Sequence, residues 1–508
     1  MIEQYIVKKR ETSANSGKWR PQYHFTAPVS WMNDPNGLIY YKGWYHLFYQ
    51  YNPKNCDWAT MHWGHAVSRD MIRWQDMPIA LKPDQPYDNH PEGGCFSGSA
   101  VEKDGILYIF YTATAKENGR TRQTQCIAWS DDGVHFQKYE GNPVVEKPSP
   151  EVSDDFRDPK VFEHAGKWYM VVGGSIGGAD SGGDGRVFLY ESETIFDWVY
   201  KGEILVSGGK LGTMFECPDF FEINGKWVLT CSPMNHPTLN KALYCVGQMD
   251  FRTGEYRIEK IGTLDAGFDY YAPQTFLDKH GNRVMVAWQN GWLWMPWCED
   301  WGPTSEENWR GTFSIPRVVT MNQKDEICLY PVKELETLIR SRESVTDLTV
   351  TREKYMIRPE TPRSFCLRIR LDIRKIKSRY LEIGVLGKGD HATVISLDLL
   401  ENILSLDKNN GDLYGRGRMN RIIRQEKDAM ELLILVDCSS VEVYAEHGRY
   451  CITSNVYPER DQTECWIRTP YKDAVIDEVT VYSMDGVWDD VPARGCAGKE
   501  KAGFGSRP

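Results

Sequence analysis

No stretch of this sequence reaches the roughly 18 consecutive apolar residues of a membrane-spanning helix, so we expect no membrane anchor. The 13 cysteines contain no C-x-x-C pair and are odd in number, which favours reduced thiols over a disulfide framework or a zinc site. The first ten residues, MIEQYIVKKR, hold no apolar segment ending in small residues, so we expect no signal peptide. Together these absences predict a cytoplasmic protein.

A strongly basic surface is also missing. Lys and Arg number 60 against 71 Asp and Glu, a net charge of −11 that argues against a nucleic-acid partner. Charged residues make up 26% and hydrophobic residues 41%, which is typical of globular proteins and excludes disorder, collagen and coiled coil. At about 150 residues per domain, 508 residues predict two or three domains. The 18 Trp and 12% aromatics suit either sugar recognition or a large β-rich core.

Five segments of the first two-thirds share one pattern: a polar or Pro-bearing entry, an apolar strand, a Gly turn and an aromatic-rich strand. Their turn glycines are Gly43, Gly105, Gly166, Gly225 and Gly281, spaced 62, 61, 59 and 56 residues apart. With the short strands that follow, each unit has about four strands in about 60 residues, the period of a propeller blade. The sequence therefore predicts an all-β fold with a five-bladed β-propeller over residues 20–335.

Carboxylates recur at one place in this repeat. Asp34, Asp158 and Glu216 lie eight or nine residues before their turn glycines, and Ser97 takes that place in the second unit. The first strand of each blade lines the channel of a propeller, so these side chains should converge. Because desolvated like charges repel, folding alone gives no reason for three acids there. Asp-Pro is also ordinary turn chemistry, which is the competing explanation for each acid taken singly.

Two other patterns are interpreted as non-catalytic. His62 and His65 are three apart in a predicted strand, where that spacing puts side chains on opposite faces, so we expect no metal site. The Gly-rich segment 173–185 lacks the GK[ST] ending of a phosphate loop and opens no helix, which indicates a loop at the rim of the channel. We therefore expect neither a metal nor an organic cofactor.

The last third of the chain has a different organisation. Apolar residues at helical spacing in VKELETLIRSR (332–342) predict a linker helix, placed at residues 336–345. Residues 346–486 read as short alternating strands with turn signals, and predict a C-terminal antiparallel β-sandwich. Residues 1–19 form an N-terminal extension, and the Gly- and Lys-bearing residues 487–508 predict a disordered tail.

Four sequence blocks carry a resemblance to a known family. RPQYHFTAPVSWMNDPNG (20–37), FSGSA (96–100), FRDPK (156–160) and ECPDFF (216–221) resemble the signature blocks of glycoside hydrolase family 32. Further matches extend the resemblance over residues 20–482. It implies a five-bladed propeller followed by a β-sandwich, and retaining hydrolysis of a terminal β-fructofuranosyl unit.

The resemblance also implies roles for the three acids. Asp34 would be the nucleophile, Glu216 the acid/base, and Asp158 the residue that holds sugar hydroxyls and stabilises the transition state. A retaining glycosidase needs its nucleophile and acid/base about 5 to 5.5 Å apart. We expect Asp34 to stay ionised and, with Asp158, to help keep Glu216 protonated, while Arg157 limits the repulsion.

The same resemblance implies a set of substrate-binding residues, with Tyr271 as a weaker candidate. The set is Trp31, Asn33, Gln50, Trp58, Phe96, Ser97, Arg157 and Trp292. For the aromatic members, ordinary core packing is the competing explanation. The segment 55–60 departs from the Gly-containing form expected beside Trp58, which leaves the leaving-group specificity open.

The sequence thus predicts a cytoplasmic exo-β-fructofuranosidase whose partner is a small carbohydrate, with no nucleic acid or membrane involved. Sucrose, sucrose 6-phosphate and short fructo-oligosaccharides are all candidate substrates. A fructosyltransferase using the same covalent intermediate is one alternative. A non-catalytic fructan-binding propeller is another, and an inverting five-bladed glycosidase a third. The sequence does not indicate the oligomeric state.

Overall fold

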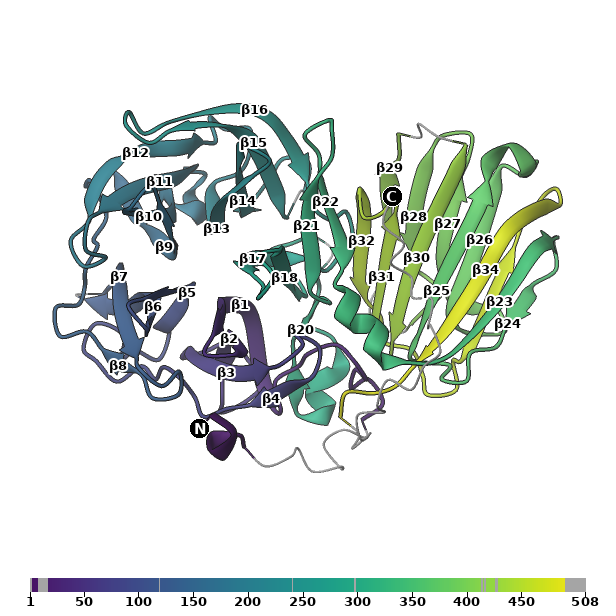
Figure 1. Cartoon of the computed structure of the whole chain (residues 1–508), viewed down its shortest axis with the longest axis horizontal. Helices are drawn as coiled ribbons and strands as arrows, with labels where there is room; N and C mark the ends of the chain where they lie inside the picture. The colour runs from purple at the N-terminus through teal and green to yellow at the C-terminus, as the bar shows by residue number, and fades with distance from the viewer. Residues whose placement is uncertain are drawn as a thin grey trace.

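A computed structural model describes residues 2–7 and 17–488, apart from residues 118, 240, 297, 413, 415, 416 and 425–427. Within these residues the chain forms seven sheets in two groups (Figure 1). Five sheets of four or five strands come from residues 30–331, and two six-stranded sheets come from residues 339–484. The predicted all-β architecture, a propeller followed by a sandwich, is confirmed.

The first three propeller sheets follow one another along the chain. The first contains β1 (Ser30–Tyr41), β2 (Trp44–Asn52), β3 (His62–Ser68) and β4 (Trp74–Asp76), with β19 (Trp309–Arg310) parallel to β1. The second contains β5 (Gly94–Lys103), β6 (Ile106–Glu117), β7 (Arg120–Ser130) and β8 (Gln137–Lys138). The third contains β9 (Val152–His164), β10 (Lys167–Ile176), β11 (Asp184–Ser192) and β12 (Val199–Val206).

Two more sheets complete the ring. The fourth contains β13 (Met214–Ile223), β14 (Lys226–Met234), β15 (Leu243–Asp250) and β16 (Glu255–Thr263). The fifth contains β17 (Tyr271–Leu277), β18 (Arg283–Gln289), β21 (Arg317–Met321) and β22 (Ile327–Pro331), with β20 (Thr312–Phe313) beside β18. Each first strand contacts the next, and β17 contacts β1, so β1, β5, β9, β13 and β17 surround a common centre (Figure 1).

Burial falls from the centre of the ring outward. All nine residues of β2 are buried, whereas the outer strand β16 alternates between exposed and covered residues. A strand covered on both faces reads as a continuous apolar run, and a half-covered strand alternates. The outermost strand is therefore the more exposed one, while the contacts among β1, β5, β9, β13 and β17 place the first strand of each repeat unit at the centre.

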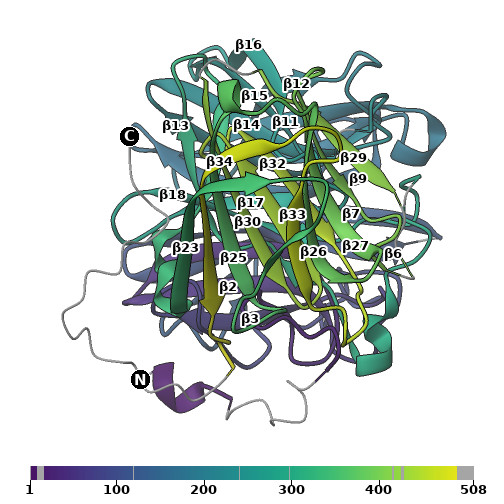
Figure 2. The ribbon, with the colours of Figure 1, turned by 90° about the vertical axis from the view of Figure 1, so that its right-hand side faces the viewer.

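The C-terminal group is a sandwich of two antiparallel sheets. One contains β23 (Ile339–Val350), β34 (Ala474–Met484), β25 (Phe365–Asp372), β30 (Ala429–Asp437), β31 (Ser440–Ala445) and β32 (Tyr450–Asn455). The other contains β24 (Tyr355–Ile357), β33 (Glu464–Arg468), β26 (Tyr380–Lys388), β27 (His391–Asp398), β28 (Ile403–Asp407) and β29 (Arg418–Ile422). Figure 2 shows these strands in front of the propeller. β32 contacts β18 and β22, so the sandwich packs against the fifth sheet.

Helical structure in the described residues is limited to short 3-10 turns. They are η1 (Ile2–Tyr5), η3 (Ala179–Ser181), η4 (Pro303–Glu307), η5 (Lys333–Leu338) and η6 (Ile373–Lys375). In this part of the chain no helix is long and apolar enough to cross a membrane. The twelve cysteines found there are free thiols.

The predicted linker helix at 336–345 is wrong over most of its length. Only η5 is helical, and β23 begins at Ile339, where it pairs with Met484 of β34. Leu335 and Leu338 are three apart and are buried together in the 3-10 turn, which explains the helical spacing seen in the sequence. Beyond them, hydrogen bonding to β34 outweighs the local pattern, because tertiary pairing overrides weak helix propensity.

The two chain ends lie only partly within the described residues. Val487 and Trp488, at the start of the predicted tail, are ordered: their N–H groups donate to the carbonyls of Gln22 (2.8 Å) and Pro21 (2.7 Å). Residues 489–508, and residues 1 and 8–16 of the N-terminal extension, lie outside the described residues.

Candidate active site

Each first strand carries a break in its pairing at the same level of the propeller. The register shifts between Met32 and Pro35 in β1 and between Phe96 and Gly98 in β5, and equivalent shifts occur in β9, β13 and β17. In the last three strands a proline follows a residue with positive φ; these residues are Asp158 (69°), Cys217 (46°) and Ala272 (51°). Proline cannot donate to the ladder, and a bulge re-aims the side chains beside it.

The three acids occupy different positions relative to these bulges. Asp34 and Asp158 lie inside it, whereas Glu216 is the last paired residue before it. The distances of eight or nine residues from each acid to its turn glycine do not reveal these different positions. Phe96, Arg157 and Tyr271 occupy the position equivalent to Glu216 in their own strands, because each is the last paired residue before the register shift.

The acids nevertheless meet at the centre of the ring. Sγ of Cys217 lies 3.5 Å from Oδ2 of Asp34 and 3.6 Å from Oδ2 of Asp158. The Cys217 backbone N–H donates to Asp158 Oδ2 at 2.9 Å, and the Ser97 hydroxyl donates to Asp34 Oδ2 at 2.6 Å. Since Cys217 follows Glu216 directly, one short segment of β13 brings all three carboxylates together.

Glu216 is held by two side chains from neighbouring sheets. Arg157 donates to Glu216 Oε1 through Nη2 (2.9 Å) and Nε (3.2 Å). The Tyr271 hydroxyl donates to the other oxygen, Oε2. The acid is therefore fixed from both sides, by β9 and by β17, while its side chain keeps 15% of its surface exposed.

Burial dominates the electrostatics of the other two acids. It raises the pKa of Asp34, with the charge of Glu216 adding to the rise and the Ser97 hydroxyl opposing it. Burial also raises the pKa of Asp158 to about 7, with Arg157 opposing and Glu216 and Asp34 adding. No hydrogen bond of normal geometry from the described residues reaches the buried Oδ1 of Asp34, although neighbouring Asn33 stabilises its charged form.

The predicted aromatic residues form one continuous wall. Trp58 contacts Phe96 at 5.8 Å and Trp292 at 6.4 Å between ring centroids, and Trp292 contacts Trp31 at 6.3 Å. Phe96, Trp58 and Trp292 are partly exposed, as a surface for a ligand requires. Trp31 is fully buried and its indole N–H donates to Asn33 Oδ1 at 2.7 Å, so it supports the wall from behind.

The remaining predicted residues are mostly buried. Gln50 is 2% exposed and its amide donates to the Cys95 carbonyl, while Ser97 and Arg157 contact the acids directly. Sequence reasoning gave Tyr271 too little weight and missed Cys217. Both could have been found by aligning the repeat units on the proline of this motif, because that alignment puts Cys217 at the position of Asp34 and Asp158, and Tyr271 at the position of Glu216.

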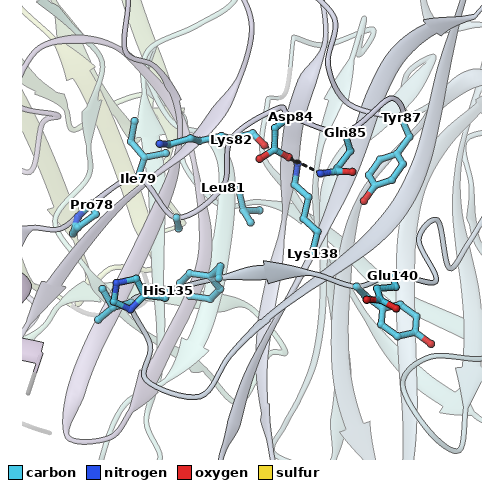
Figure 3. A pocket seen from close by; sticks show the side chains of 14 residues that line it. Pro78, Ile79, Leu81, Lys82, Asp84, Gln85, Tyr87, His135, Lys138 and Glu140 are labelled. Carbon is cyan, nitrogen blue, oxygen red and sulfur yellow. Dashed lines mark hydrogen bonds and ion pairs between the residues drawn. The ribbon is translucent and has the colours of Figure 1, made fainter.

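The two histidines and the Gly-rich segment interpreted as non-catalytic lie in a packed strand and in a connection between strands. His65 is buried and stacks on Phe48 at 4.3 Å, while His62 is partly exposed. The Gly-rich segment forms the β10–β11 connection with η3 and no α-helix. Figure 3 shows a separate hollow between the first two sheets, where Lys138 pairs with Asp84; none of the predicted site residues lines it.

Comparison with known proteins matches the whole architecture. The model of the glycosyl hydrolases family 32 N-terminal domain matches residues 24–331, and the family 32 C-terminal model matches residues 334–483. A sucrose-6-phosphate hydrolase of Zymomonas mobilis is 33% identical over 485 residues, covering 90% of this chain and 91% of that protein. A raffinose invertase of Escherichia coli is 31% identical over 494 residues, covering 93% and 97%. A β-fructofuranosidase structure from Bombyx mori has a TM-score of 0.78 at 29% identity, covering 96% of this chain and 98% of that one.

Proposed function

Because the chain belongs to glycosyl hydrolase family 32, and is thus a glycoside hydrolase acting on O-glycosyl bonds, we propose that it is a retaining exo-β-fructofuranosidase. Its substrates would be sucrose, sucrose 6-phosphate or short fructo-oligosaccharides, from which it releases the terminal β-D-fructofuranosyl unit. Relatives named sucrose-6-phosphate hydrolase and raffinose invertase support this substrate class.

The observation that carries the proposal is the pair of oxygens on Asp34. Oδ2 is occupied by Ser97, whereas Oδ1 is buried and lacks a hydrogen bond of normal geometry from the described residues. Neighbouring Asn33 also stabilises the charged form of Asp34, as a carboxylate nucleophile requires. We assign Asp34 as the nucleophile.

In the first step a carboxylate oxygen of Asp34 attacks the anomeric carbon of the fructosyl unit, and the bond to the leaving oxygen breaks. Glu216 gives its proton to that oxygen, so the leaving group departs as a neutral alcohol. In the second step Glu216 takes a proton from water, whose oxygen attacks the same carbon and releases Asp34. Two displacements restore the original configuration.

Asp158 and Arg157 would support the charge changes. The transition state resembles an oxocarbenium ion, and Asp158 places a carboxylate beside it in a water-poor site, where electrostatic interactions are strong. Arg157 is fixed against Glu216, which keeps the acid aimed at the leaving oxygen. The partly exposed wall of Phe96, Trp58 and Trp292 offers apolar rings to the sugar faces.

Two variants and one product analysis test the proposal. Asp34→Asn should abolish fructose release from sucrose, sucrose 6-phosphate, 1-kestose, inulin and levan, while sucrose binding measured by calorimetry persists. Asp104→Asn, an exposed change in the β5–β6 turn, is the matched control and should retain activity. Near-normal turnover by Asp34→Asn would remove it from the nucleophile role.

The stereochemistry of the reaction is determined from the product formed when methanol is the acceptor. Transfer of the fructosyl unit to methanol should give methyl β-D-fructofuranoside by NMR, and the α-anomer would refute retention. At high sucrose, free fructose should exceed longer oligosaccharides; the reverse ratio would establish the fructosyltransferase alternative. Fructan binding by the wild type without any release of fructose would establish the binding-module alternative.

A further inference from the structure

A fourth carboxylate, Asp155, shares the arginine that holds Glu216. It lies on β9 two residues before Arg157, so the two side chains share one face of the strand. Arg157 Nη1 donates to Asp155 Oδ1 at 3.0 Å, while Nη2 donates to Glu216 Oε1 at 2.9 Å. The planar guanidinium thus bridges two carboxylates on opposite ends of its fork.

Asp155 is anchored independently of the arginine. Its second oxygen, Oδ2, accepts the backbone N–H of Ala179 at 2.9 Å, and the Ser153 hydroxyl lies 3.4 Å away. Ala179 is buried and begins η3 in the β10–β11 connection. Partial burial disfavours the charged form, but Arg157 and the Ala179 amide leave the pKa of Asp155 below its ordinary value. Asp155 is therefore a fixed anion at neutral pH.

Charged groups of both signs surround Glu216. Arg157 presents a positive charge to the Glu216 carboxyl group, whereas Asp34 and Asp158 are acids close enough to interact with it. The neutral groups facing it are the Tyr271 hydroxyl and the Cys217 thiol. Asp155 accepts a hydrogen bond from the Nη1 end of Arg157, away from Glu216, and its negative charge partly neutralises the guanidinium. It therefore weakens the electrostatic effect of Arg157 on Glu216.

We propose that Asp155 is a positioning residue which, by sharing Arg157 with Glu216, keeps Glu216 protonated over a wider pH range. The proposal rests on the acid/base role of Glu216 proposed above. Gln123, whose Oε1 lies 3.3 Å from Arg157 Nη1, completes the support of the guanidinium but carries no charge.

The test is the pH profile of kcat/KM for sucrose in Asp155→Asn. Asparagine keeps the size of the side chain and one acceptor but removes the charge, so Arg157 acts on Glu216 alone. The alkaline limb should move to lower pH by about half a unit to one unit, a threefold to tenfold loss of kcat/KM at high pH. The acid limb and the activity at the optimum should change much less.

The control is Asp154→Asn, the adjacent residue, which makes the same charge change on an exposed side chain paired with Lys147 at 3.1 Å. Its profile should match the wild type. Asp155→Ser removes the charge in a second way and should give the same shift as Asp155→Asn.

Each outcome decides the proposal. A uniform fall in kcat without movement of the alkaline limb would mean that Asp155 only maintains structure, as would loss of folded protein in both variants. An equal shift in Asp154→Asn would mean a general charge effect. Failure of the proposed function is distinguishable, because the wild type would then release no fructose at any pH.

Discussion

A buried histidine between the propeller and the sandwich makes stability depend on pH. Nδ1 of His24 lies 2.8 Å from Asp437 Oδ2, and Nε2 lies 3.2 Å from Glu442 Oε1. A neutral imidazole has only one N–H, so two carboxylates on its two nitrogens require the doubly protonated, charged form. Burial alone would lower the pKa of His24, but the two carboxylates outweigh it and raise that pKa to about 9.

The size of the effect follows from linkage. Raising the pKa from 6.5 to about 9 corresponds to about 3 kcal/mol of folding free energy. Because the folded-state value lies above the unfolded one, this stabilisation is fully present below pH 6.5 and is lost as pH rises through 9. Glu442 stays ionised throughout, since Arg317 and His24 outweigh burial and lower its pKa to about 2.

The assay is urea unfolding from pH 6 to 9.5, followed by tryptophan fluorescence, on the wild type and His24→Gln. The wild type should lose about 3 kcal/mol more unfolding free energy over this range than His24→Gln, which lacks the titrating group. His135→Gln changes a solvent-exposed histidine, 62% exposed, and should follow the wild type. Equal pH dependence in wild type and His24→Gln would refute the charged state of His24.

Two further predictions concern other buried charges. Asp158 has a folded-state pKa of about 7, above its unfolded value of 3.8, so its ionisation makes stability fall as pH rises between these values. Asp158→Asn should therefore lose about 4 kcal/mol less than the wild type between pH 4 and pH 8 in thermal and urea unfolding, and an identical pH dependence would contradict the shift. Lys160 Nζ lies 3.0 Å from buried Asp219 Oδ2, so Lys160→Met should lower the unfolding free energy by about 3–5 kcal/mol. The double variant Lys160→Met/Asp219→Asn should recover part of that loss, and a purely additive loss would show that the two charges do not compensate one another.

The repeat could be found in the sequence because its signal is local. Each turn glycine has a positive φ in the structure, near 80° at Gly43, Gly105 and Gly281, where other residues are strained. The spacing of these glycines is therefore set by the backbone, and it predicts the order of the sheets. The linker could not be predicted in the same way, because strand β23 depends on pairing with β34, more than 100 residues later in the chain.

The sequence could predict which residues form the candidate site, but not how their side chains are arranged in it. The motifs identified Asp34, Asp158 and Glu216, and the structure brings them together around Cys217. Their different positions relative to the bulge depend on backbone pairing between strands, and the bridge from Asp155 through Arg157 to Glu216 depends on side chains from two sheets. Asp34 and Glu216 both lie nine residues before their turn glycines, yet Asp34 is the second unpaired residue of its bulge and Glu216 is the last paired residue before its own, so an alignment on the glycines hides this difference.

The position relative to the bulge separates the chemical environments of the acids. Asp34 and Asp158, inside the bulge, are 8% and 3% exposed, and their raised pKa values show that the free site bears an electrostatic cost. Glu216, the last paired residue before its bulge, remains partly exposed and is oriented by Arg157 and Tyr271. In the proposed mechanism a cation developing on the sugar would relieve the cost at the two buried acids, so their stabilising effect would appear in the transition state rather than in the free protein. The bulge therefore does more than turn the chain: it places the proposed nucleophile in a dry environment and leaves the proposed proton donor at its edge.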